Sequence, residues 1–227
     1  MDSDLENDTA SKEEATFVQL DNALSCVEWK DGFPLEVHLL GEITQQSASE
    51  FETSFKDAIR SGQEEIVVVI HSEGGCVYSA SKIVDLIEMS PVPVHTVCRG
   101  SAMSAAAMIF SCGEHRVIGK RASLMIHAAS STVYGKAMDV KIESKELERL
   151  TTQMCKVMAE NTGQTPDFFQ KRMDTNTDLY ISPAEAIDLG LATHIGDIRL
   201  NTKISVHTSA QILTYRAKKT KKRKRSA

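Results

Sequence analysis

The chain has 227 residues, of which 41% are hydrophobic and 25% are charged, and its formal net charge at pH 7 is −5. This balance is typical of a globular protein and argues against a disordered chain or a membrane protein. It contains no apolar run of about 18 residues and it begins with an acidic stretch, so we expect neither a membrane span nor a signal peptide, and predict a cytoplasmic protein.

The cysteines favour reduced thiols over disulfides or zinc. There are five of them, an odd number, and none forms a C-x-x-C pair. No metal-ligand cluster and no phosphate-binding G-x-x-x-x-G-K motif is present, so we predict no metal and no cofactor. Any use of ATP would need a separate partner.

The two ends of the chain differ from its middle. Residues 1–15 are acidic and lack periodicity, which predicts a disordered leader. Residues 201–227 form an extension whose last ten residues, KKTKKRKRSA, carry seven basic groups. This basic tail could contact nucleic acid or an acidic partner, act as a targeting signal, or only be a solvated tail. The folded domain is expected over residues 16–200.

Strand and helix patterns alternate through the folded domain. Strands are predicted at 35–43, in the Val/Ile run of EEIVVVIHSEGG, at VPVHTVCRG and at 122–127, and helices at 47–62, 78–90 and 101–113. A long helix over 139–163 carries an apolar stripe and ends at Gly163, and two short helices follow, in TPDFFQKRMD and after Ser182. The alternation predicts an α/β fold of βαβ units around a mainly parallel sheet.

Three separate segments carry residues that fit acyl-transfer chemistry. Ser104 lies near the start of an Ala-rich helix, where backbone N–H groups could hold a developing oxyanion. His127 closes a strand and could act as the general base. Asp178 precedes the last capped helix and could orient that histidine, although Asp174 competes for the role. Each residue alone also has a structural interpretation, such as a cap or a turn.

Taken together, the segments resemble the proteolytic subunit of the Clp protease, ClpP, over residues 35–197. HSEGG resembles the family's S-P-G-G loop, GSAMSAAA its nucleophile segment, LMIH its M-I-H motif, and DLYISPAEAIDLGLA its D-R-F-L-S-A-P-E-A segment. The resemblance implies a ClpP/crotonase-like fold in which the helix over 139–163 is a projecting handle. It also implies that Ser104 is the nucleophile, His127 the base and Asp178 the orienting acid, with the N–H groups of Gly75 and Ala105 as the oxyanion hole.

The same resemblance implies a serine endopeptidase that cuts peptides or unfolded proteins inside stacked homo-oligomeric rings, usually heptameric. Three positions depart from the family pattern: Glu73, Ala106 and the pair Ala128–Ala129. The region before Leu35 lacks the family's axial-loop segments, which argues against docking to a Clp ATPase. Alternatives are a phage-type head-maturation protease that needs no ATPase, a catalytically silent ring subunit, and a crotonase-type hydratase or isomerase.

Overall fold

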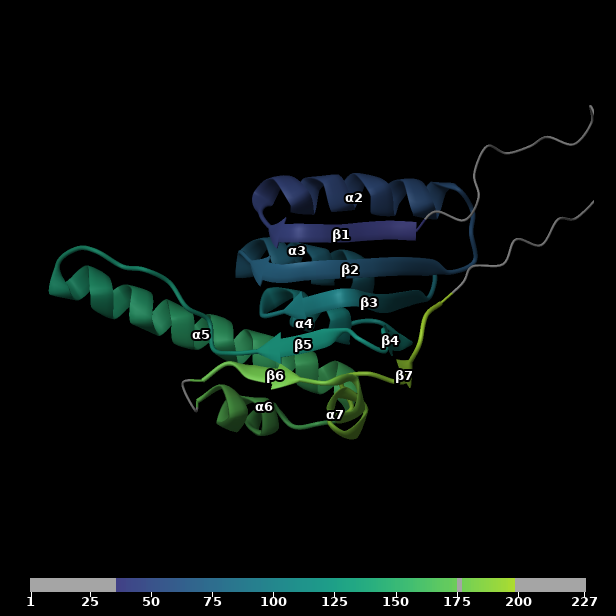
Figure 1. Ribbon diagram of the computed structural model, residues 1–227. Coiled ribbons are helices and arrows are strands. Elements are labelled where there is room, and N and C mark those ends of the chain that lie inside the picture. Colours follow the sequence, from purple (N-terminus) through teal and green to yellow (C-terminus); the bar gives the residue numbers. More distant parts are fainter. Residues whose placement is uncertain (1–35, 175–176, 199–227) are drawn as a thin grey trace, which may run out of the picture. The chain divides into compact units, whose positions relative to one another are not determined.

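Strands and helices alternate along the chain in a computed structural model that describes residues 36–174 and 177–198 (Figure 1). The elements are β1 (Glu36–Ile43), α2 (Gln45–Arg60), β2 (Ile66–Gly75), α3 (Val77–Glu88), β3 (Val94–Met103), α4 (Ala105–Ser111), β4 (Arg116–Ile118), β5 (Ser123–Ile126), α5 (Ala137–Thr162), α6 (Pro166–Met173), β6 (Leu179–Ile181), α7 (Pro183–Asp188) and β7 (His194–Ile195). The leader predicted over 1–15 and the extension over 201–227 lie outside the described residues.

The strands form one mixed sheet in which nearly all neighbours are parallel. Strands β1, β2, β3, β4 and β7 lie side by side in that order, and β5 pairs with β3. Strand β6 pairs with β5 in the antiparallel sense. The predicted mainly parallel α/β sheet is confirmed, and the βαβ connections place the carboxyl ends of β2, β3 and β5 at one edge of the sheet.

Strand β3 has two partners on the same side. Its first half, at Thr96–Cys98, pairs with β4, and its last residues, Ser101–Met103, pair with β5. The prediction that a helix begins at residue 101 was therefore wrong, because the strand continues through Met103 and α4 begins only at Ala105. Pairing with β5 extends the strand over small residues that alone favour a helix.

The core lies between the sheet and the helices packed against it. The Val/Ile run of β2, Ile66–Ile70, is buried on both faces of the sheet, as expected for a central parallel strand. The Ala-rich α4 is buried along its whole length against β2 and β3. Because α4 is covered on every side, its first residue is held firmly at the edge of the sheet.

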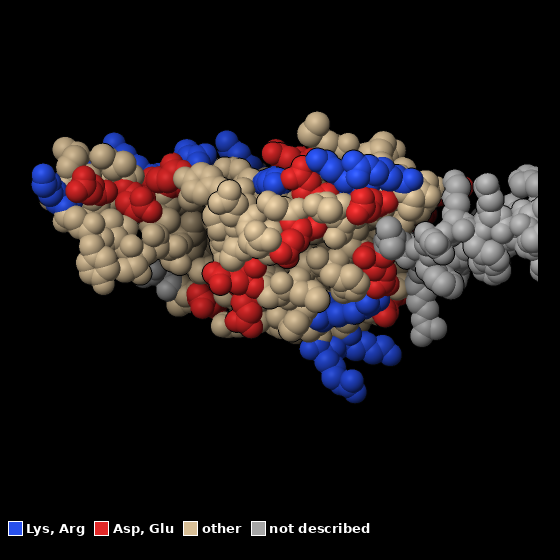
Figure 2. Space-filling model, turned by 90° about the horizontal axis from the view of Figure 1, so that it is seen from above, with Lys and Arg blue, Asp and Glu red and all other residues tan. Residues whose placement is uncertain are grey.

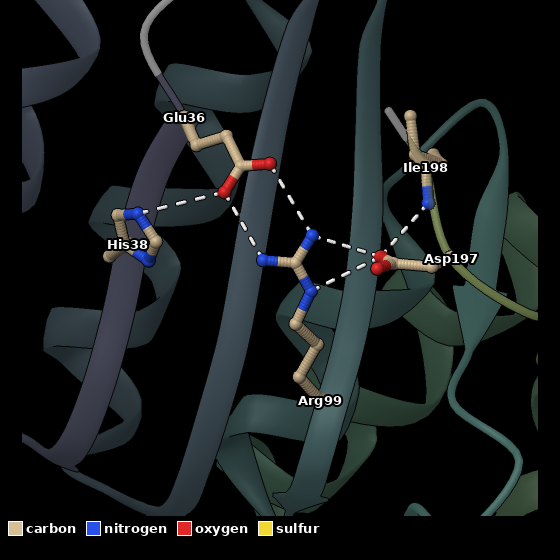
Figure 3. A network of polar contacts seen from close by, with 5 residues as sticks. All are labelled: Glu36, His38, Arg99, Asp197 and Ile198. Carbon is tan, nitrogen blue, oxygen red and sulfur yellow. Dashed lines mark hydrogen bonds and ion pairs between the residues drawn. The ribbon is translucent and has the colours of Figure 1, made fainter. Parts of the chain in front are cut away.

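The face of the sheet opposite α4 carries a smaller apolar cluster of Val67, Val69, Val97 and Val117. Polar contacts cross this face above the cluster. The Arg99 guanidinium donates to both carboxylate oxygens of Glu36, at 3.2 and 3.3 Å, and to Oδ1 of Asp197, at 2.9 and 3.1 Å (Figure 3). His38 lies beside Glu36 in the same view. One side chain of β3 therefore joins the first described strand to the segment that follows β7.

Helix α5 is the longest element, and only part of it packs on the core. Leu150, Met154 and Met158, in its second half, are buried, whereas Met138 and Ile142, in its first half, are 65% and 60% exposed. Figure 1 shows the first half extending beyond the sheet. The predicted projecting helix is confirmed.

The described part of the chain contains neither a membrane-spanning helix nor a group of metal ligands. Among residues 36–174 and 177–198, no helix combines the length and apolar character that a bilayer span requires. Within the same ranges, no three His, Cys, Asp or Glu side chains are grouped as metal ligands would be, and Cys76, Cys98, Cys112 and Cys155 are free thiols.

Candidate active site

Ser104 occupies the sharp turn between β3 and α4. Its φ of 55° and ψ of −122° lie where non-glycine residues are rarely found, and it is the only non-glycine residue with positive φ in the described ranges. Such a conformation costs on the order of 1–3 kcal/mol and persists only when the surroundings impose it. Here the Ser104 N–H donates to the Met125 carbonyl of β5 at 2.7 Å. Strand β5 therefore fixes the turn that presents the serine hydroxyl.

The glycine loop after β2 lies directly against this turn. A Cβ added to Gly74 would lie 2.7 Å from the Met103 carbonyl oxygen and 2.8 Å from the Ser104 Cβ. The φ of Gly74 is also positive, at 95°. Only glycine fits here, because a side chain would both clash and strain the backbone. The double glycine thus brings the backbone of one strand end against the serine of the next.

His127 follows β5 immediately and reaches Ser104. Its Nε2 lies 2.7 Å from the Ser104 Oγ, within hydrogen-bond distance. The two residues are brought together because Met103 and Met125 are paired in register at the ends of β3 and β5. An imidazole in this position can accept the hydroxyl proton of serine, which makes the oxygen a nucleophile.

Asp178 faces the other nitrogen of the same imidazole. Its Oδ1 lies 3.6 Å from His127 Nδ1, which is ion-pair range and longer than a hydrogen bond. Asp174, the competing candidate, instead ends α6 and accepts a hydrogen bond from Gln170. Of the two aspartates, the geometry therefore favours Asp178, which lies just before β6 and faces the histidine.

Thr151 of α5 holds the segment that follows His127, a contact that the sequence did not indicate. Its hydroxyl accepts from the Ala129 N–H at 3.0 Å and donates to the Leu147 carbonyl at 2.8 Å. Thr151 is buried, and its only sequence signal is a threonine among the apolar residues of a helix. The contact ties the chain after the histidine to the projecting helix.

The predicted oxyanion donors belong to the two segments already described, the end of β2 and the start of α4. Ala105 is the first residue of α4, where a backbone N–H has no acceptor in the preceding turn. It is close to the glycine loop, because its nitrogen lies 3.2 Å from the position of a Cβ on Gly74. Gly75 ends β2, opposite Ile43 of β1.

Comparison with known proteins agrees with this geometry. The Clp protease family profile matches residues 35–199, which is most of the chain. The chain belongs to the Clp protease family. It is 36% identical over 142 residues to the ATP-dependent Clp protease proteolytic subunit 2 of Synechococcus sp. (strain CC9605), covering 60% of this chain and 70% of that protein.

Other members of the family give the same result. The ATP-dependent Clp protease proteolytic subunit 1 of Corynebacterium diphtheriae is 35% identical over 141 residues, covering 60% of this chain and 65% of that protein. The structure of a ClpP1 point mutant from Listeria monocytogenes superposes with a TM-score of 0.65 at 28% identity, covering 73% of this chain and 93% of that one. The predicted ClpP-type fold and ClpP-like serine endopeptidase are confirmed, and the phage-type, silent-subunit and crotonase alternatives are not favoured.

Proposed function

We propose that Ser104, His127 and Asp178 are the catalytic triad with which this ClpP-like chain hydrolyses peptide bonds. The observation that carries the proposal is the 2.7 Å contact between Ser104 Oγ and His127 Nε2, with Asp178 at the other ring nitrogen. The three residues come from separate elements that meet at one edge of the sheet. This order of nucleophile, base and acid along the chain is acceptable, because triads are defined by geometry.

The reaction begins when His127 Nε2 takes the proton of the Ser104 hydroxyl as Oγ bonds to the substrate carbonyl carbon. The carbonyl oxygen becomes an oxyanion, which the N–H groups of Gly75 and Ala105 stabilise. The imidazolium then gives its proton to the leaving amine, the C–N bond breaks and an acyl-serine remains. Water, deprotonated by the same imidazole, releases the acid. Asp178 stabilises the imidazolium and keeps the neutral ring protonated at Nδ1.

We further propose that the chain works as a homo-oligomer of stacked rings. The first half of α5 presents Met138 and Ile142, which lie four residues apart on one face of the helix and are 65% and 60% exposed, and such an apolar pair favours a partner surface. A heptameric ring in the cytoplasm, admitting peptides and unfolded chains, agrees with the resemblance.

On the face in Figure 2, acidic and basic side chains are interspersed, so this face offers no basic patch to nucleic acid.

An ATPase partner is favoured by one observation and disfavoured by another. The names of the relatives describe them as subunits of an ATP-dependent protease. The chain itself has Glu73 in place of the loop proline and lacks the family's axial-loop segments before Leu35. Capture of Clp ATPases on the immobilised full-length protein would distinguish the two cases.

The triad is tested by labelling with a fluorophosphonate probe and by hydrolysis of a quenched fluorescent peptide. We expect Ser104→Ala to abolish labelling and His127→Ala to reduce hydrolysis by at least about 10³-fold. Asp178→Asn should lower kcat strongly, whereas the matched control Asp174→Asn should leave most of it when the peptide carries no basic residue. Full labelling of Ser104→Ala, or equal losses for the two aspartate variants, would contradict the assignment.

A further inference from the structure

A cavity of about 490 Å³ adjoins the proposed triad. It is bounded by the residues directly after His127, by one side of α5 and by the end of α6. Ala128, Ala129, Val133 and Leu147 supply apolar surface to its wall. The wall begins at Ala128, the residue next to His127, so the cavity lies close to the bond that the proposed triad would cleave.

The charged residues that line this cavity are all acidic. They are Glu148 on α5 and Asp174 at the end of α6, and no lysine or arginine is among the lining residues. In the described ranges, the Glu148 carboxylate makes no ion pair within 4.0 Å. Asp174 accepts one hydrogen bond, from the neutral Gln170. The cavity therefore carries negative charge that this part of the chain does not neutralise.

In the described ranges, the basic side chains nearest in sequence on α5 and α6 form no ion pair with these two carboxylates. Arg149 is directed to Glu146, to which it donates at 2.9 Å through Nε, and to Gln153. Lys145 lies one turn before Glu148 and forms no ion pair with it in the structure. Arg172 on α6 is stacked on the ring of Phe168, with its guanidinium carbon 3.5 Å from the ring centroid.

We propose that this cavity receives a lysine or arginine side chain of the substrate, at a position flanking the cleaved bond. The inference rests on the proposed function, since it takes Ser104 and His127 as the reacting groups. A long basic side chain matches the cavity in two ways. Its methylene stem covers Leu147 and Val133, while its charged end reaches the carboxylates of Glu148 and Asp174. The peptidase would thus prefer basic residues at the cut.

The test compares substrates that differ only in this charge. Quenched peptides carry lysine, or its uncharged isostere norleucine, on either side of the cleaved bond, and kcat/KM is measured with the full-length protein. We expect lysine to exceed norleucine by about fivefold, the upper range for a solvent-accessible ion pair. Glu148→Gln and Asp174→Asn should each reduce that ratio, and together should remove it. The matched control Glu143→Gln, on α5 outside the cavity, should leave it unchanged.

Ionic strength gives an independent readout. Because the attraction is electrostatic and partly screened by solvent, raising salt should lower kcat/KM for the lysine peptide and not for the norleucine peptide. A norleucine peptide cut as well as the lysine peptide by an active enzyme would overturn the inference. So would a lysine preference that persists in the double variant. If the folded protein cuts neither peptide and does not label at Ser104, the proposed triad fails as well.

Discussion

Ser104 is held in its unusual backbone conformation by two neighbours from different strands. Met125 accepts its N–H and Gly74 packs against it without a side chain. A relaxed serine at the start of α4 would direct its hydroxyl elsewhere, so the strain is part of how the site is built. The backbone conformation of this residue therefore depends on a glycine 30 positions earlier in the chain.

We predict that Gly74→Ala abolishes labelling of Ser104 and lowers the free energy of unfolding by about 1–3 kcal/mol. The added Cβ would lie 2.7 Å from the Met103 carbonyl oxygen, so the turn at Ser104 would have to move. The control is Gly41→Ala, where φ is also positive, at 73°, but nothing lies within 4 Å of the added Cβ. That variant should lose only about 1 kcal/mol and keep its activity. Denaturant unfolding and probe labelling measure both effects. An active Gly74→Ala protein would contradict the prediction.

The chemistry of the site was more predictable than its geometry. Sequence motifs predicted Ser104, His127 and Asp178 as a triad, and the structure places these three side chains near one another. The positive φ of Ser104 has no sequence signal and the contact of Thr151 with Ala129 has only a weak one, because both depend on how separate strands and helices meet. Asp178 could be chosen over Asp174 only once α6 and β6 had been placed.

At the scale of elements, segments with a periodic pattern or a clear cap were predicted well, including the short helices α6 and α7, and the shortest strands were not. Helix α5 and the buried run of β2 follow from hydrophobic spacing alone. Strands β4, β6 and β7 have only two or three residues, too few for a pattern, and exist because a neighbouring strand supplies their partners. The same pairing explains why Ser101–Met103 extend β3 instead of beginning α4.

We predict that Arg99→Gln lowers the free energy of unfolding by about 1 kcal/mol, because it removes the link between β1 and the segment after β7. Its hydrogen bonds to Glu36 and then to Asp197 raise the pKa of Arg99, so the guanidinium stays charged. The control Arg60→Gln loses only a pair with Asp57 on one helix and should cost less than about 0.5 kcal/mol. Denaturant unfolding at low and high salt measures both, and a salt-independent loss would contradict an ionic origin.

At the scale of the whole molecule, the projecting half of α5 has no evident role in an isolated subunit. The exposed apolar side chains of Met138 and Ile142, on a helix extending from the sheet, gain nothing in water. The same helix anchors the segment after His127 through Thr151. Assembly and catalysis would therefore share one element.

We predict that Ile142→Glu lowers the oligomer mass measured by light scattering and reduces peptide hydrolysis in parallel. The side chain is 60% exposed in the single chain, so the substitution should leave the fold of the subunit intact. The control Met89→Glu changes an even more exposed methionine, at 83%, which follows α3. It should leave both mass and activity unchanged. An Ile142→Glu protein of unchanged mass would argue against α5 as the contact.

Strand β6 has only three residues and pairs with β5 alone. Asp178 immediately precedes it, so the acid of the proposed triad depends on one of the weakest attachments in the sheet, far from the buried run of β2. Short edge elements open locally at a lower free energy than the core. We expect warming to release Asp178 from His127 while β2 is still intact, so that hydrolysis falls several degrees below the unfolding midpoint. Amide hydrogen exchange at Leu179–Ile181 should be correspondingly faster than at Ile66–Ile70.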